Sequence, residues 1–450
     1  MVALSGIRVL FIAAFLLIGK TSLAAASFST SAAFSFANLG QRIQLVEQAA
    51  PPKLSASPLL RFFALPDGVV VAVANRLLVV VTDTQVVPKL TSLSAVQEER
   101  RLGRVAGGEL LLLTVRDVRS VIALLPMLEG MPGVLSVQPD ISQNITRQHS
   151  ARFLDWQSFN LAEAIGLTDA WRSSRGEGVR VAIIDSGIDL QHPDMRGTRL
   201  QGAWDVASGT GNVAPLMSNE THGTLVTGLI FARHNGVGID GVAPEAGLIA
   251  IRQVSGWSSE VAAALLAAGE AGADVINCSW SFPWMFEPVA RVVDYLAQQG
   301  RGGKGTVVVI AAGNRPRELN RLSQFAAYPA LVAVTATDHQ GGRYGSAFGN
   351  RVFLAAPGMV KTTGTHFDGY EPLGATSAAA AITSGVAALM LSVAPGLKRS
   401  QVMELLAATA TRQPPEDFPA GRSPWLGAGE IHAGRAVRAA IDWLHKETMQ

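Results

Sequence analysis

The chain has 450 residues, of which 48% are hydrophobic and 16% charged, so it is too apolar for a disordered protein. Its 37 basic and 35 acidic residues give a formal net charge of +2, which provides no electrostatic case for a nucleic-acid partner or an anionic membrane surface. The single cysteine, Cys278, excludes an intrachain disulfide and a cysteine-based zinc or iron–sulfur site.

The N-terminus has the pattern of a signal peptide. Arg8 is followed by an apolar run, Val9–Gly19, and then by the small residues Ala24–Ala26, which suit a signal peptidase. We therefore predict a signal peptide over residues 1–26 and export to the periplasm or the extracellular medium. An uncleaved segment would instead anchor the chain in a membrane, and Lys20, just after the run, keeps that alternative open.

The next part of the chain predicts a spacer and a small domain. Residues 27–60 are rich in Ser, Ala and Pro, and we interpret them as a loose spacer. Residues 61–145 carry β-type apolar runs and one apolar pattern at helical spacing. The β-runs are Val69–Val81, Glu109–Val115 and Gly133–Val137, and the helical pattern is Val118–Leu128. Strand, helix and strand in this order predict a small α/β domain.

Residues 150–445 alternate continuous apolar runs with helical patterns, which predicts a mostly parallel sheet with helices on both faces. The expected strands are Val179–Ile184, Gly247–Arg252, Asp274–Cys278, Thr306–Ala311, Leu331–Thr335 and Val352–Ala355, and the expected helices include Ser259–Gly269 and Pro288–Gln299. The fold class is therefore α/β, with a small α/β domain before the larger one.

Four short motifs place polar side chains where a reaction could occur. Asp185 ends the apolar run VAIID, at the sheet edge where open α/β sheets bind ligands. His222 opens a helical pattern, Asn314 follows the apolar run VVVIAAG, and Ser377 opens an Ala-rich helical pattern. Taken singly, each has an ordinary alternative: a turn cap, a chance histidine, a turn asparagine and a helix N-cap.

Together the motifs DSGID, HGT, AAGN and ATSAAA resemble those of the subtilisin-like (subtilase) serine peptidase family, in which the catalytic order is also Asp, His, Ser. The connecting segments Gly236–Arg252 and Tyr328–Asp338 resemble those of the family, and so do Ala355–Gly358 and Leu426–Val437. The resemblance implies the subtilisin-like fold and a serine endopeptidase that acts on protein or peptide substrates.

The resemblance also implies roles for individual residues. Ser377 would be the nucleophile, His222 the general base, Asp185 the residue that orients it, and Asn314 an oxyanion donor together with the Ser377 N–H. Two segments would form the walls of the pocket for the substrate side chain before the cleaved bond. These segments are Ser279-Trp280-Ser281 and Ala311-Ala312-Gly313.

The same resemblance implies that residues 61–145 are a propeptide that assists folding and inhibits the enzyme until it is cut away. The protein would then be a zymogen, with the cleavage expected between Asp140 and Asp155. The chain's own propeptide would be its intramolecular partner, and neither a nucleic acid nor a membrane is expected as a partner unless the signal segment stays uncleaved.

Several residues near the motifs depart from the family pattern. Ala375 stands where Gly is usual, and the bulky Trp280 stands where Leu is common, so we expect a reshaped cleft and narrow specificity. The other departures are Leu225, Ala378, Ala381 and Ile382. None removes a proton carrier or an oxyanion donor. They nevertheless favour, as an alternative function, a subtilisin-fold binding or assembly protein with little turnover. A serine esterase or transferase is a further alternative.

No cofactor is expected to be required. The sequence lacks an HExxH motif, a P-loop and a dinucleotide-binding glycine pattern. Asp194 lies in a His-Pro-Asp segment similar to one that supplies a calcium ligand in some family members. Calcium needs six to eight oxygen ligands, so a single carboxylate leaves a calcium site possible but unsupported.

Overall fold

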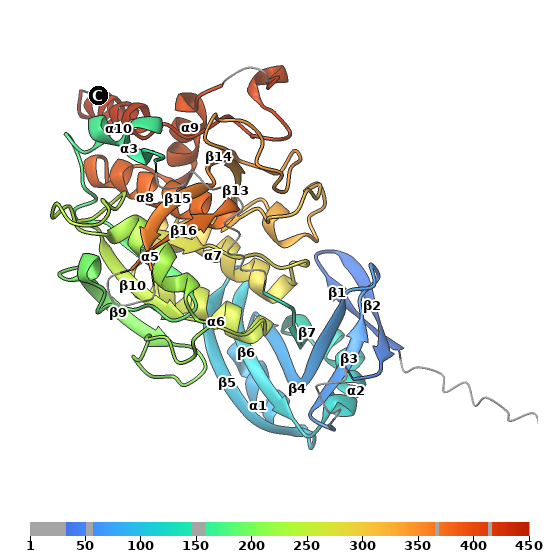
Figure 1. Cartoon of the computed structure of the whole chain (residues 1–450). Coiled ribbons are helices and arrows are strands. Elements are labelled where there is room, and N and C mark those ends of the chain that lie inside the picture. Colours follow the sequence, from blue (N-terminus) through green and yellow to red (C-terminus); the bar gives the residue numbers. More distant parts are fainter. Residues whose placement is uncertain (1–32, 51–56, 146–157, 365–368, 413–415, 450) are drawn as a thin grey trace, which may run out of the picture.

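The computed structural model describes residues 33–50, 57–145, 158–364, 369–412 and 416–449. The predicted signal peptide, residues 1–26, lies outside this part, as does most of the interval expected to contain the cleavage point. The described chain forms a large parallel-sheet unit and a smaller N-terminal sheet unit (Figure 1).

The larger unit is built on a seven-stranded sheet in which every pair of neighbours is parallel. Its order is β14-β13-β12-β11-β8-β10-β9. The strands are β8 (Arg180–Asp185), β9 (Arg199–Asp205), β10 (Gly247–Arg252), β11 (Val275–Cys278), β12 (Val307–Ala311), β13 (Val332–Thr337) and β14 (Leu354–Pro357). The prediction of a parallel sheet is confirmed. Only β9 was missed, because it has no continuous apolar run.

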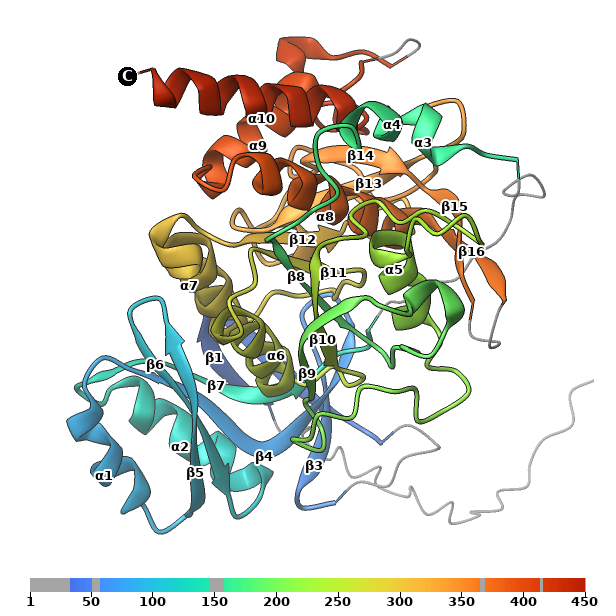
Figure 2. The same ribbon diagram turned by 90° about the vertical axis from the view of Figure 1, so that its left-hand side faces the viewer.

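Helices cover both faces of this sheet, as expected (Figure 2). On one face lie α5 (His222–Phe231), α8 (Ala375–Val393), α9 (Arg399–Thr409) and α10 (Ala433–Thr448), with the short α3 (Leu161–Ala164) and α4 (Leu167–Ala170) beside α10. On the other face lie α6 (Ser258–Glu270) and α7 (Glu287–Gly303). A two-stranded antiparallel sheet, β15 (Met359–Thr363) with β16 (Tyr370–Gly374), leads directly into α8.

Helix α8 is the central helix of the larger unit. Its small side chains let it pack closely against the sheet and against α5 and α10, and every residue from Ala375 to Leu391 is buried. It is the one described helix that is long and apolar enough to cross a membrane, but 89% of its most apolar window lies inside the protein. Its apolarity is therefore that of a core helix.

The N-terminal unit is an antiparallel sheet in the order β1-β2-β3-β4-β6-β5, with β7 paired to β4. The strands are β1 (Ala33–Asn38), β2 (Gln41–Gln48), β3 (Leu60–Ala64), β4 (Val70–Val81), β5 (Val96–Val105), β6 (Gly108–Val115) and β7 (Val134–Ser142). Its helices are α1 (Val87–Thr91) and α2 (Val118–Glu129). Four short 3-10 helices complete the described chain: Thr84–Val86, Pro193–Met195, Phe325–Ala327 and Pro419–Gly421.

The prediction of a loose spacer over residues 27–60 is wrong for its described part. Strands β1 and β2 form a hairpin whose turn residues, Leu39 and Gly40, both have positive φ (50° and 78°), as the tight turns preferred in hairpins require. Alternate residues of the hairpin point into the core of the N-terminal unit, among them Phe34, Phe36 and Leu45. The Ser, Ala and Pro content of the segment hid this alternation.

The two units pack together through α6 and α7, which lie between the two sheets in both views (Figures 1 and 2). Apolar side chains of β4, β5 and β6 join those of the two helices in one buried cluster. This cluster includes Leu78, Val80, Val105, Leu110 and Leu112 from the N-terminal unit and Val261, Leu265, Leu266, Val289, Val292 and Leu296 from the helices. The N-terminal sheet thus covers a helical face that would otherwise be an exposed apolar patch.

Polar side chains of the N-terminal unit also bind the first turns of both helices. The buried Asp140 carboxylate accepts hydrogen bonds from the Ser259 N–H (2.9 Å) and hydroxyl (2.7 Å) at the start of α6. The Asn38 side-chain oxygen accepts one from the Glu287 N–H (2.8 Å) at the start of α7. Because the first N–H groups of a helix have no partner within the helix, these contacts satisfy donors that would otherwise be unpaired.

Candidate active site

Asp185 is the last residue of β8, at the carboxyl edge of the parallel sheet. The apolar residues before it bury the strand, and Asp185 itself has no exposed surface. Its Oδ1 accepts a hydrogen bond from the Ser186 N–H at 2.7 Å, which holds the carboxylate in place. A buried carboxylate fixed in this way can orient a neighbouring imidazole.

His222 is the first residue of α5, and its ring lies against Asp185. The His222 Nδ1 is 2.9 Å from Asp185 Oδ1 and 3.0 Å from Oδ2. A proton on Nδ1 satisfies the carboxylate, so the unprotonated nitrogen of the neutral ring is Nε2. The next residue, Gly223, permits this approach: a Cβ there would overlap the Ser186 carbonyl oxygen, and its N–H donates to the Ser186 Oγ at 2.9 Å.

Ser377 lies in the first turn of α8, with its Oγ 3.0 Å from His222 Nε2. The same Oγ lies 2.9 Å from the Ser279 carbonyl oxygen, and the Ser279 hydroxyl donates to the Ser377 carbonyl at 2.9 Å. The single Ser377 hydroxyl proton can therefore go to either of two acceptors. Donation to Nε2 is the arrangement that prepares Oγ for attack on an electrophile.

Asn314 follows β12 and is oriented by the residue before Ser377. Its Oδ1 accepts hydrogen bonds from the Thr376 N–H (3.0 Å) and from the Thr376 hydroxyl. Because these bonds occupy the oxygen end of the planar carboxamide, Nδ2 is the end available to a ligand. Asn314 also lines the adjoining hollow, so its position suits donation to a developing oxyanion.

A hollow of about 420 Å³ adjoins Asn314 and contains four of the residues predicted to bind substrate or the oxyanion: Ser281, Ala312, Gly313 and Asn314. Ser279 and Ala311, also predicted as walls, do not line it. Sequence reasoning missed several other lining residues. They are Ile145, Phe282, Pro283, Arg315, Arg317, Leu319, Gln324, Phe325, Ala326 and Ala347.

The prediction that the bulky Trp280 side chain reshapes the cleft is wrong. Trp280 is 1% exposed, and its indole N–H donates to the Ile184 carbonyl oxygen at 2.6 Å. It packs against Phe282 and Phe325, with ring centroids 5.1 and 5.8 Å away. Trp280 therefore supports the cleft from the core and does not face a substrate.

A buried ionic network anchors the loop before His222, and no sequence motif pointed to it. The guanidinium of Arg252, at the end of β10, donates to the Glu220 carboxylate (2.9 Å from Nε to Oε2) and to Asp205 (3.1 Å). Burial opposes ionisation of Glu220, but the hydrogen bonds from Arg252 and the Leu216 N–H outweigh it, so the pKa of Glu220 is lowered. An ionised Glu220 stays paired with Arg252 two residues before the imidazole.

Asp194 is the carboxylate that the sequence offered as a calcium ligand, and a calcium site there stays a hypothesis. Within the described residues, no group of three or more His, Cys, Asp or Glu side chains could hold a metal. Asp194 is buried, with Oδ2 accepting from the Ile239 N–H (3.0 Å) and Oδ1 without a hydrogen-bond partner. The side-chain oxygen of Asn235, in the adjoining loop, accepts from the Val237 N–H. A calcium ion here would need Asp194 Oδ1 together with further oxygens, such as backbone carbonyls, to reach six to eight ligands.

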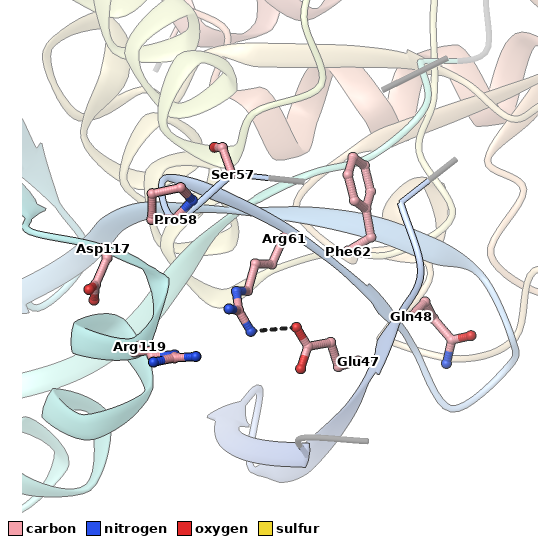
Figure 3. Close-up of a pocket in the computed structure, with 8 residues that line it drawn as sticks. All are labelled: Glu47, Gln48, Ser57, Pro58, Arg61, Phe62, Asp117 and Arg119. Atoms are coloured by element: carbon pink, nitrogen blue, oxygen red, sulfur yellow. Dashed lines mark hydrogen bonds and ion pairs between the residues drawn. The ribbon is translucent and has the colours of Figure 1, made fainter. Parts of the chain in front are cut away.

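Another hollow, of about 460 Å³, lies on the N-terminal unit (Figure 3). An ion pair between Arg61 and Glu47 (2.6 Å) crosses it, and Asp117 and Arg119 line one side. No histidine is present among the lining residues, so it lacks a general base of the kind that His222 provides.

Comparisons with known proteins agree with this geometry. A family model described as the subtilase family, Peptidase S8, matches residues 176–429. The calcium-dependent protease of Trichormus variabilis is 32% identical over 319 residues, which cover 60% of this chain but only 48% of that relative, so the chain spans about half its length. Thermitase of Thermoactinomyces vulgaris is 30% identical over 283 residues, covering 61% of this chain and 94% of thermitase.

Among solved structures, fervidolysin from Fervidobacterium pennivorans, described as a keratinolytic enzyme related to subtilisin, matches with a TM-score of 0.63. The match covers 81% of this chain and 61% of fervidolysin at 23% sequence identity. At this identity the likeness is one of fold.

Proposed function

The chain belongs to the subtilase family, whose model matches more than half of it, and on that premise we propose that the protein is a serine endopeptidase made as an exported zymogen. The observation that carries the proposal is the chain of contacts from Asp185 to His222 Nδ1 and from His222 Nε2 to the Ser377 Oγ. These three residues have the order and the mutual geometry of a catalytic triad.

In the proposed reaction, Ser377 Oγ attacks the carbonyl carbon of a peptide bond while its proton passes to His222 Nε2. The oxyanion that forms accepts hydrogen bonds from Asn314 Nδ2 and the Ser377 N–H at the start of α8. His222 then gives its proton to the leaving amine as the C–N bond breaks. Water attacks the resulting ester, His222 takes one of its protons, and that proton returns to Ser377 Oγ as the acid departs.

We further propose that the N-terminal unit, expected at residues 61–145 but with its sheet beginning at Ala33, inhibits the peptidase unit at 150–445. Two observations support this. The N-terminal sheet is packed onto α6 and α7, and Ile145, just beyond β7, lines the hollow beside Asn314. In this proposal the unit occupies the cleft until the connection is cut.

Export rests on the sequence of residues 1–26 alone, and we propose the periplasm or the extracellular medium as the destination. No cofactor is proposed. The substrate is proposed to be a protein or peptide that binds in extended form.

The test compares full-length wild type with Ser377→Ala after expression with the signal segment, recording the intact mass of each product and the hydrolysis of a mixed peptide set. We expect the wild type to lose its N-terminal unit and to cleave peptides, and Ser377→Ala to do neither. A matched control is Ser392→Ala on the same helix, whose hydroxyl bonds the Glu177 carbonyl and which should process like wild type. A folded wild type that stays full length and inactive would favour the binding or assembly alternative.

A further inference from the structure

The segment after β7 pairs with the edge of the catalytic unit. Ser142 forms an antiparallel bridge with Trp257, and the Gln143 N–H donates to the Gly256 carbonyl at 3.1 Å. Gly256 permits this approach, because a Cβ at this position would overlap the Gln143 carbonyl oxygen. The segment is therefore held as an added strand, which is how a groove holds an extended peptide.

The Gln143 side chain makes two hydrogen bonds to the backbone of a single residue, Trp284. Its Nε2 donates to the Trp284 carbonyl at 2.9 Å, and its Oε1 accepts from the Trp284 N–H at 2.9 Å. Gln143 is only 6% exposed. The backbone fixes which end of the carboxamide faces each group, since a carbonyl can only accept and an N–H can only donate.

The surroundings of this carboxamide are otherwise mainly apolar. Around Gln143 lie Gly256, Ser258, Val261, Phe282, Trp284, Phe286, Val289 and Phe325, and the space left among them is only about 10 Å³. This volume is at the lower limit for one water molecule. A side chain that left the Trp284 N–H and carbonyl unpaired here would therefore leave two partly buried polar groups without a partner, which costs stability.

The direction of the chain places Gln143 upstream of the reacting centre. Two residues later, Ile145 lines the hollow together with Ala312, Gly313 and Asn314. The segment thus runs from the carboxamide contact toward the oxyanion side of the cleft. A substrate following the same path would carry the equivalent of Gln143 on the acyl side of the bond that is cut.

We propose that the cleft selects peptide substrates with glutamine at this upstream position, and that Gln143 occupies the subsite as an internal copy of the substrate. The primary carboxamide of glutamine both donates to the Trp284 carbonyl and accepts from its N–H. Glutamate lacks the donor and buries a charge, while leucine and methionine lack both partners. The proposal rests on the proposed peptidase function and specifies its substrate class.

The first experiment incubates self-processed wild-type enzyme with a proteome-derived peptide library, with Ser377→Ala as the blank, and reads the cleavage sites by mass spectrometry. We expect glutamine to be enriched at one fixed upstream position. Matched peptides with glutamate or leucine there should be cut at least about tenfold more slowly in kcat/KM, the effect of one unpaired buried polar group. Equal or faster cleavage of the leucine peptide would overturn the proposal.

A second experiment does not depend on activity. In the full-length Ser377→Ala chain, hydrogen exchange at the Trp284 amide is compared with and without Gln143→Leu. We expect protection to fall by about tenfold or more on substitution, and Asn144→Leu, which changes the exposed neighbouring residue, to leave it unchanged. Unchanged protection in Gln143→Leu would contradict the proposal. If no library peptide is cleaved, the peptidase function fails, and this exchange result still decides whether the site recognises a carboxamide.

Discussion

The Thr376 N–H donates to Asn314 Oδ1 at 3.0 Å, so the residue next to the nucleophile also sets the direction of the oxyanion donor. The two residues are 62 positions apart, Asn314 just after β12 and Thr376 in the first turn of α8, and they meet beside the nucleophile. Because the oxygen end of the carboxamide is held, Nδ2 is presented without any rearrangement during the reaction. Donors that are fixed in advance are the ones that contribute most to transition-state stabilisation.

Asn314→Ala should therefore lower kcat by about 10²–10³-fold, the range for loss of one oxyanion donor. KM should change little, since the bond forms only in the transition state. Steady-state kinetics on a single peptide would measure both values, and Asn320→Ala, an exposed asparagine after the same strand, serves as the matched control. A fall in kcat of less than about threefold would mean that Asn314 is not a donor to the oxyanion.

Ala375 should be a strained position. Its φ is +54°, in the left-handed region that disfavours a Cβ, and it immediately precedes Thr376 and Ser377. Ala375→Gly should therefore raise the free energy of unfolding by about 0.5–1 kcal/mol, measured by urea denaturation of the Ser377→Ala protein. The matched substitution Ala378→Gly, inside α8, should lower it by about 1 kcal/mol, because glycine is unfavourable within a helix. If both substitutions changed the free energy of unfolding in the same direction, Ala375 would not be a strained position.

The stability of the larger unit should depend on pH through Glu430. Burial raises the pKa of the Glu430 carboxyl, the Thr337 hydroxyl bond opposes the rise, and Asp338 adds to it. A carboxyl whose folded-state pKa is raised stabilises the fold below its ordinary pKa and loses that contribution as pH rises through the raised value. Glu430→Gln, which removes the buried charge, should therefore raise Tm at pH 8, with the gain shrinking as pH falls to 4.

Glu416 provides a control, because its pKa is shifted in the opposite direction and its effect on stability should depend on pH in the opposite sense. Burial opposes its ionisation, but hydrogen bonds from Arg343 and Ser423 outweigh this effect and lower the pKa of Glu416. Its contribution to stability is present above its ordinary pKa and is lost as pH falls through the lowered value. Glu416→Gln should lower Tm at pH 8 and have less effect in acid. Thermal unfolding of both variants between pH 4 and pH 8 checks the two predictions. A rise in Tm of Glu430→Gln that does not depend on pH would contradict a raised pKa of Glu430.

Chelation should leave the protein unchanged. No group of three or more His, Cys, Asp or Glu side chains among the described residues could hold a metal, and Asp194 is the single carboxylate that the sequence offered as a calcium ligand, so we expect excess EDTA to change neither Tm nor kcat/KM. Differential scanning calorimetry with EDTA, and then with added calcium, provides the measurement. A large drop in Tm that calcium reverses, and that Asp194→Asn abolishes, would establish a calcium site that includes Asp194.

The sequence predicted the residues of the site better than their surroundings. Asp185, His222 and Ser377 each stand in a short motif at the end of a strand or the start of a helix, and parallel strands bring those ends to one edge. The direction of Trp280 was misjudged, although the alternation Ile276, Cys278, Trp280 places all three in the same buried cluster. Extending this alternation of side-chain direction past the end of β11 would have predicted that the Trp280 indole lies in the core.

The N-terminal hairpin and the Gln143 contact were harder to foresee for different reasons. The alternation of Phe34 with Phe36 was present in the sequence but outweighed by the composition of the segment around it. The pairing of Gln143 with Trp284 joins residues 141 positions apart through backbone atoms, which no side-chain pattern encodes. Only the three-dimensional structure brings that carboxamide to the cleft.

Labelling with a fluorophosphonate probe, which reacts with an activated serine, followed by peptide mapping of the processed protein, tests whether Ser377 is the nucleophile. We expect one label, on Ser377, in wild type and in Ser392→Ala, and none in Ser377→Ala or His222→Ala. A processed, folded wild type that carries no label on Ser377 would contradict the assignment of this residue as the nucleophile.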